Sequence, residues 1–237
     1  MLDLMATIVL TATLVVNLNA TIAAMPLSSI QKLTTVTISG LWIGFAIALA
    51  ATGIYAPSST PTPVVGLMVI VPLIAVGAMA AFSANVRNTL SALPLPLLIG
   101  LNTMRILTGA FMLLDAWQGR LSGPFPQSAG WGDITAGLIA IPLIAAAARD
   151  LAGNRSVVLA WNILGTLDLV TAVALGVLSA PGSPLQMFGG AIGSTAMWSL
   201  PQSVVPTLLV PFYLIVHGII FARLFTGVAR IGEPAPA

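Results

Sequence analysis

The chain has 237 residues, of which 58% are hydrophobic and only 6% are charged, and it contains no cysteine. A soluble domain carries about 25% charged residues, so this sequence lacks the polar surface that keeps a folded domain in water. The composition therefore indicates an integral membrane protein without a separate ATPase, kinase or nucleic-acid-binding domain. The lack of cysteine also excludes disulfides, thiolate metal sites and iron–sulfur clusters.

Long apolar runs predict the membrane-spanning helices. A helix needs about 20 apolar residues to cross the ~30 Å hydrocarbon core of a bilayer. Runs of about this length lie at residues 4–25, 36–55, 64–82, 90–114, 131–147, 157–178 and 204–225. Turn-forming residues separate these runs. We therefore expect an all-α, polytopic integral membrane protein, with one transmembrane domain of seven helices over residues 1–237.

Basic residues predict the orientation of the chain, because Lys and Arg are enriched in loops on the cytoplasmic side. One side of the predicted spans carries Lys32, Arg87, Arg149, Arg155, Arg223 and Arg230. The other side carries only Arg120. With seven spans, this distribution places the N-terminus outside and the C-terminus in the cytoplasm. We expect a multi-pass protein of the cell membrane, with a bacterial inner membrane as the simplest assignment.

The stretch between the sixth and seventh runs, residues 180–202, is uncharged and holds an apolar segment at 185–200. Such a segment can dip into the membrane as a cap. It can also form an ordered surface loop with an interfacial helix, and the sequence leaves both alternatives open.

Polar side chains inside the predicted spans form the candidate site, because charged groups in the hydrocarbon region normally face the bundle interior. Arg105 lies near the middle of the fourth span, and Asp168 lies at matching depth in the sixth. Asn102 shares a helical face with Arg105, as Tyr213 does with His217. We therefore expect an interior substrate-binding cluster of Arg105, Asp168, Asn162, Asn102, Tyr213 and His217.

Two roles stay open for the ionisable members of this cluster. Arg105 and Asp168 form either part of a ligand or ion pathway or a buried ion pair that only fixes the order of the helices. His217 either handles protons together with Asp168 or is a core histidine with satisfied hydrogen bonds.

Three further features carry local predictions. Asp133 ends a Gly-Trp-Gly-Asp sequence and is either the N-cap of the fifth span or part of an acidic outer mouth. Asp115, close to Arg120, is expected to be a solvated charge at the membrane interface. Gly40 and Gly44 predict a surface where two helices pack closely.

Missing residues exclude several functions. The only lysine, Lys32, lies outside the last span, so a retinal Schiff base is excluded. A membrane zinc hydrolase would need more histidines than His217 alone, and we expect no metal site. No serine lies in a Gly-x-Ser-x-Gly elbow, but a serine hydrolase that uses His217 stays open as an alternative.

The first surviving function is a transporter or channel for a small polar or anionic solute or for protons, with the buried polar site at mid-membrane. The alternative is a non-transport membrane subunit or sensor that binds a cofactor or a partner chain. An intramembrane enzyme acting on a lipid is a third class. The expected partners are the lipid bilayer and the solute, with a second copy or a partner subunit left open. The sequence assigns no cofactor.

Overall fold

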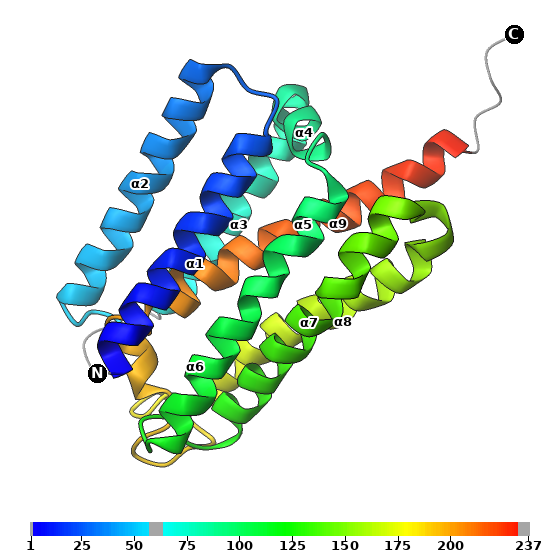
Figure 1. Cartoon of the computed structure of the whole chain (residues 1–237). Helices are drawn as coiled ribbons and strands as arrows, with labels where there is room; N and C mark the ends of the chain where they lie inside the picture. The colour runs from blue at the N-terminus through cyan, green and yellow to red at the C-terminus, as the bar shows by residue number, and fades with distance from the viewer. Residues whose placement is uncertain (1, 57–63, 232–237) are drawn as a thin grey trace, which may run out of the picture.

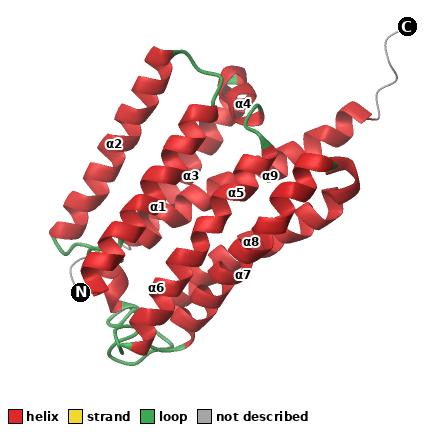
Figure 2. Ribbon diagram, viewed as in Figure 1, coloured by secondary structure: helices red, strands yellow, loops and turns green. Residues whose placement is uncertain are grey.

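The computed structural model describes residues 2–56 and 64–231, and it places the side chains of residues 3–56 and 64–225. Over these residues the chain forms helices and loops without strands, as Figure 2 shows. The all-α class is confirmed. Seven helical stretches in the described part are long and apolar enough to span a membrane. The predicted orientation and the single-domain assignment stay predictions.

The first two spans are α1 (Leu2–Ala24) and α2 (Ser29–Ala51). The apolar run at 36–55 therefore gave the wrong start for the second helix. A capping box explains the earlier start, because Ser28 accepts a hydrogen bond from the Gln31 backbone while the Gln31 side chain accepts one from the Ser28 backbone. This signal lies in a polar segment that an apolar window does not include.

The third span is α3 (Val64–Phe82), and it leads into the short helix α4 (Ala84–Ser91). The fourth span consists of α5 (Leu95–Leu101), a 3₁₀ turn η1 (Asn102–Met104) and α6 (Arg105–Trp117). The predicted span at 90–114 was thus wrong at its start. Pro94 separates α4 from α5, because proline has no N–H to continue a helix and suits the position before a new one.

The remaining spans are α7 (Pro124–Arg149), α8 (Leu151–Leu178) and α9 (Val210–Ile231), the last preceded by a π-helical turn η3 (Val205–Leu209). Helix α7 begins before the predicted residue 131, because Pro124 occupies its first position. Asp133 therefore lies well inside α7, and the predicted alternative that it is the N-cap of this helix is wrong. The N-cap is Gly123. Helix α8 begins before the predicted residue 157, because Asp150 caps it by accepting a hydrogen bond from the Gly153 N–H.

Residues 179–204, which we call the cap loop, join α8 to η3 and contain one short 3₁₀ helix, η2 (Thr195–Trp198). Ser122 anchors this loop, because its hydroxyl donates to the Gly189 carbonyl at 2.5 Å and accepts from the Gly193 N–H at 2.9 Å. Gly193 has a φ of +47°, and a Cβ there would overlap the Ser179 carbonyl, so only glycine fits. The cap loop is an ordered structure over one end of the bundle, which we call the cap end.

The bundle is built around α9 and the α5–α6 span, which are its most buried helices. Helices α6, α7 and α8 lie side by side, whereas α2 lies at the edge of the molecule (Figure 1). Gly40 and Gly44 are exposed on α2 with no neighbouring atom within 4 Å of where a Cβ would stand. The prediction that they form a packing surface between helices of this chain is wrong.

Basic side chains bond helix carbonyls at the end opposite the cap loop. Lys32 Nζ donates to the Ala23 carbonyl at 2.8 Å, near the end of α1. Arg87 donates to the Ala80 carbonyl at 2.9 Å, near the end of α3. These contacts satisfy carbonyls that have no partner within their helices and place positive charge at helix C-termini.

Candidate functional site

Arg105 is the centre of the candidate site. It is the first residue of α6, directly after the 3₁₀ turn η1, and it is 0% exposed. Its Nε donates to Asp133 Oδ1 on α7 at 2.7 Å, and its Nη2 donates to Asp168 Oδ2 on α8. One guanidinium therefore joins carboxylates from two other spans.

The remaining guanidinium nitrogen contacts His217 on α9. Arg105 Nη1 lies 3.3 Å from His217 Nε2. Because a guanidinium can only donate, this ring nitrogen accepts, and the proton of a neutral imidazole is on Nδ1. Nδ1 then donates to Asn162 Oδ1 at 2.7 Å, while Asn162 Nδ2 donates to the His217 backbone carbonyl at 3.2 Å. The hydrogen-bond network thus assigns a neutral His217 with a defined tautomer.

Tyr213 connects this cluster to α1. The Arg105 guanidinium carbon lies 5.8 Å from the centre of the Tyr213 ring, within the range of a cation–π contact. Asn17 Nδ2 on α1 donates to the Tyr213 hydroxyl at 2.8 Å. We call Arg105, Asp133, Asp168, Asn162, Tyr213 and His217 the arginine cluster.

Two glycines give the cluster its space. A Cβ at Gly132 of α7 would overlap the Asp168 carboxylate. A Cβ at Gly165 of α8 would lie 2.7 Å from the His217 ring and 3.3 Å from Arg105 Nη1. Both helices therefore approach the cluster closely only because these positions have no side chain.

Gly132→Ala should lower the free energy of unfolding by about 1–3 kcal/mol, the usual cost of overpacking a filled site, because the new methyl group displaces the Asp168 carboxylate. The matched control is Gly44→Ala on α2, where the added methyl group meets open space. That change should be neutral or stabilising by up to about 1 kcal/mol. Thermal unfolding in detergent measures both, and equal effects would contradict the close contact at Gly132.

The charges of the cluster do not balance. One guanidinium faces two carboxylates, and the arrangement of His217 adds no charge. If both carboxylates are ionised, the cluster carries one negative charge in excess. Taking such a charge out of water is costly, so the site favours a proton or another cation that balances it.

Several buried oxygen atoms around the cluster have no hydrogen-bond partner among the described residues. They are Thr13 Oγ1 and Asn17 Oδ1 on α1, Asn102 Oδ1 on η1 and Thr108 Oγ1 on α6. A buried oxygen of this kind is suited to accept from water or to contact a cation. These atoms extend the polar region from Arg105 along α1 and along the α5–α6 span.

Five of the six predicted site residues lie together in the arginine cluster: Arg105, Asp168, Asn162, Tyr213 and His217. The sixth, Asn102, is buried on the same span, but its amide donates to the Leu98 carbonyl at 3.1 Å. Asp133 is the member that sequence reasoning placed elsewhere, at the start of the fifth span. Its role in an outer mouth stays a prediction.

Asp115 was expected to be solvated, and this expectation is wrong. Asp115 is 0% exposed and lies at the cap end of α6. Gln202 Nε2 of the cap loop donates to it at 3.1 Å, and Arg120 lies 3.3 Å away. Arg120 also pairs with Asp3 at 2.6 Å. This second charged group ties the cap loop to α1 and α6.

No group of three or more His, Asp or Glu side chains in the described part of the chain is arranged to hold a metal ion. The cluster instead combines hydrogen-bond donors and acceptors around a fixed positive charge. Such an arrangement can bind and release protons or orient a small polar molecule.

The fold and the site define an all-helical protein in which long apolar helices enclose a buried arginine and two carboxylates. The chain belongs to the family described as Domain of unknown function (DUF8737), which matches residues 62–225. The matched range contains the whole arginine cluster, whereas Asn17 of α1 lies outside it. No curated protein and no solved structure matches the chain.

Proposed function

We propose that this protein carries protons across the membrane and that the arginine cluster is its exchange site. The observation that carries the proposal is the buried Arg105 shared by Asp133 and Asp168 from two other spans. Ionisable groups inside membrane spans are costly and commonly mark ion or proton pathways. A helix-ordering contact alone would need only one carboxylate to balance the arginine.

The excess of carboxylates favours a proton or cation over an anion as the exchanged species. An anionic solute that binds Arg105 would have to displace Asp133 or Asp168, because these carboxylates already accept from Nε and Nη2. It would also add a negative charge to a site in which two carboxylates already face one guanidinium. A proton bound by one carboxylate removes the imbalance.

Irregular helix geometry beside the site supports movement there. The fourth span tightens into the 3₁₀ turn η1 immediately before Arg105, and the π-helical turn η3 precedes α9. Mid-span 3₁₀ and π segments are frequent at hinges and functional sites. Transporters also commonly place their binding sites at interrupted helices near the bilayer midplane.

The proposal includes an orientation and a location. The basic residues Lys32, Arg87 and Arg155 lie at the end opposite the cap loop, which supports a cytoplasmic assignment for that end. The cap end, with the N-terminus of α1, then faces outside. A bacterial inner membrane fits this arrangement.

Asp168→Asn tests the proposal. The change should leave a balanced Arg105–Asp133 pair, so the protein should fold while its proton flux is lost. Purified protein is reconstituted in vesicles that contain a pH-sensitive dye, and a potassium diffusion potential drives the flux. The matched control is Asp150→Asn, since Asp150 is exposed at the start of α8 and asparagine caps a helix as well as aspartate does.

Flux that is lost in Asp168→Asn and retained in Asp150→Asn would support the carrier. Equal flux in wild type, Asp168→Asn and empty vesicles would contradict it, provided that the wild-type protein elutes as a folded species. Circular dichroism and size-exclusion elution of each variant separate loss of flux from loss of fold.

A further inference from the structure

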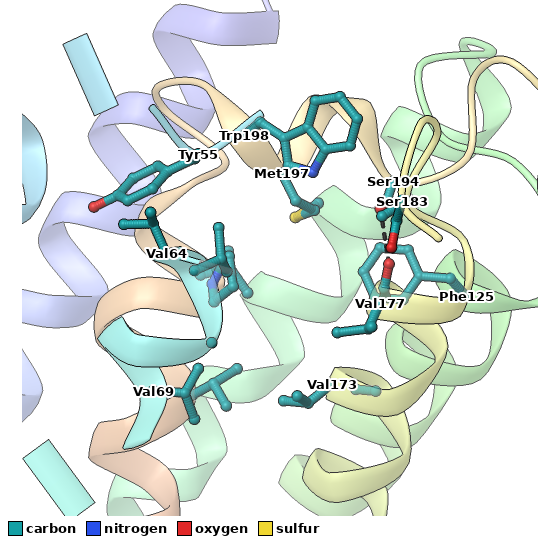
Figure 3. A pocket seen from close by; sticks show the side chains of 18 of the residues that line it. Tyr55, Val64, Val69, Phe125, Val173, Val177, Ser183, Ser194, Met197 and Trp198 are labelled. Atoms are coloured by element: carbon teal, nitrogen blue, oxygen red, sulfur yellow. Dashed lines mark hydrogen bonds between the residues drawn. The ribbon is translucent and has the colours of Figure 1, made fainter. Parts of the chain in front are cut away.

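A cavity of about 730 Å³ lies at the cap end, apart from the arginine cluster. Figure 3 shows its walls: Val69 of α3 and Val173 of α8 stand on opposite sides, and Met197 and Trp198 of the cap loop lie at the far end. The lining residues of α8 run from Ala172 to Val177, about 8 Å along the helix at ~1.5 Å per residue, and Ala180 of the cap loop also lines the cavity. The cavity therefore lies between α3, α8 and the cap loop.

The lining is apolar. No charged residue is among the described side chains that line the cavity, and its polar groups bond the protein itself. Ser194 donates to the Gly176 carbonyl at 2.9 Å, and Tyr55 donates to the Ala46 carbonyl at 2.8 Å. Burial raises the pKa of Tyr55, so its hydroxyl remains a neutral donor. Cavities of this size and lining bind apolar ligands.

The cavity reaches the exposed surface of the molecule beside α8. Two of its lining residues, Val177 of α8 and Leu185 of the cap loop, are 38% and 59% exposed. Val177 lies on the same helical stripe as the exposed Leu167 and Val170. An apolar stripe on a membrane-spanning helix contacts acyl chains, so the opening communicates with the bilayer core.

We propose that this cavity holds one acyl chain of a bilayer phospholipid, which enters sideways between α3 and α8 at the cap end. The chain lies parallel to the spans, as acyl chains do in the surrounding leaflet, and contacts Val69 and Val173. Its ester end lies beside the Trp198 ring, because amphipathic aromatic rings favour the boundary between hydrocarbon and water. The proposal is independent of the proton-carrier function.

Tryptophan quenching tests the proposal. The wild-type protein and Trp198→Phe are reconstituted in phosphatidylcholine brominated near the glycerol end of its acyl chains, and the difference between their emissions isolates Trp198. Val173→Phe should narrow the cavity between Val69 and Val173 and remove most of the quenching of Trp198. The matched control is Val170→Phe, which adds the same ring on the exposed stripe of α8, and it should leave the quenching unchanged.

Val69→Phe narrows the cavity from the opposite wall and gives a second test if Val173→Phe does not fold. Native mass spectrometry provides an independent readout, because Val173→Phe and Val69→Phe should lose a phospholipid that wild type and Val170→Phe retain. Equal quenching in Val173→Phe, Val69→Phe and Val170→Phe would show contact with surrounding lipid only and would overturn the proposal. Quenching by a brominated alkane but not by the brominated phospholipid would assign the cavity to a free apolar solute and would also overturn it.

Discussion

Arg105→Gln should lower the free energy of unfolding by about 3–5 kcal/mol, the usual cost of removing one partner from a buried ion pair. Arg105 is 0% exposed and donates to both Asp133 and Asp168. Glutamine is neutral and has only two N–H donors, so two carboxylates would remain buried without a compensating charge. Thermal and denaturant unfolding of the purified protein in detergent measure the loss.

Arg87→Gln is the control for that experiment. Arg87 is exposed and bonds helix carbonyls at the end opposite the cap loop. Its replacement should change stability by no more than about 0.5–1 kcal/mol. An equally small change in the stability of Arg105→Gln would contradict the claim that the Arg105 guanidinium stabilises the two buried carboxylates.

The triple variant Arg105→Gln, Asp133→Asn and Asp168→Asn should recover most of the stability that Arg105→Gln loses. Neutral groups of similar shape can replace a buried charged network at little cost or with a gain, whereas a half-removed network is strongly destabilised. The recovered protein should still carry no protons, because no ionised carboxylate remains next to position 105. The measurement pairs thermal unfolding with the vesicle flux assay.

This pair of readouts distinguishes the two roles left open for Arg105 and Asp168. A purely helix-ordering network predicts that the triple variant regains fold and function together. A carrier predicts that it regains the fold alone. A triple variant that folds and transports as well as wild type would therefore contradict the proposed function.

The sequence predicted the helical class and the positions of the seven spans well, since long apolar runs directly report segments that cross a bilayer. It missed the starts of four spans for local reasons. The capping box at Ser28, the prolines at Pro94 and Pro124, and the N-cap Asp150 begin helices within polar or mixed segments. A prediction that looks only for runs of apolar residues does not detect these capping and proline signals.

The candidate site was predicted in part. Periodicity placed Arg105 and His217 on interior faces, but it did not give the rotation of α7 relative to α6. Asp133 therefore looked like a helix cap, although it is bonded to Arg105. The sequence did not reveal the close approach of Gly132 to Asp168, because glycine is common in membrane spans whether or not another helix packs against it.

The apolar cavity could not be predicted from sequence. Val173 lines it and Val170 faces outward, yet the two residues are the same type, three positions apart on one helix. Only the packing of α3, α8 and the cap loop distinguishes a valine that lines a cavity from one that contacts lipid.

The central claim is that the excess negative charge of the arginine cluster is balanced by a mobile proton. The most direct test is the selectivity of the flux in vesicles that contain the wild-type protein and a pH-sensitive dye. The account predicts a flux that follows the proton gradient, is unchanged when chloride is replaced by an impermeant anion, and disappears in Asp168→Asn. A flux that follows the chloride gradient and persists in Asp168→Asn would contradict it.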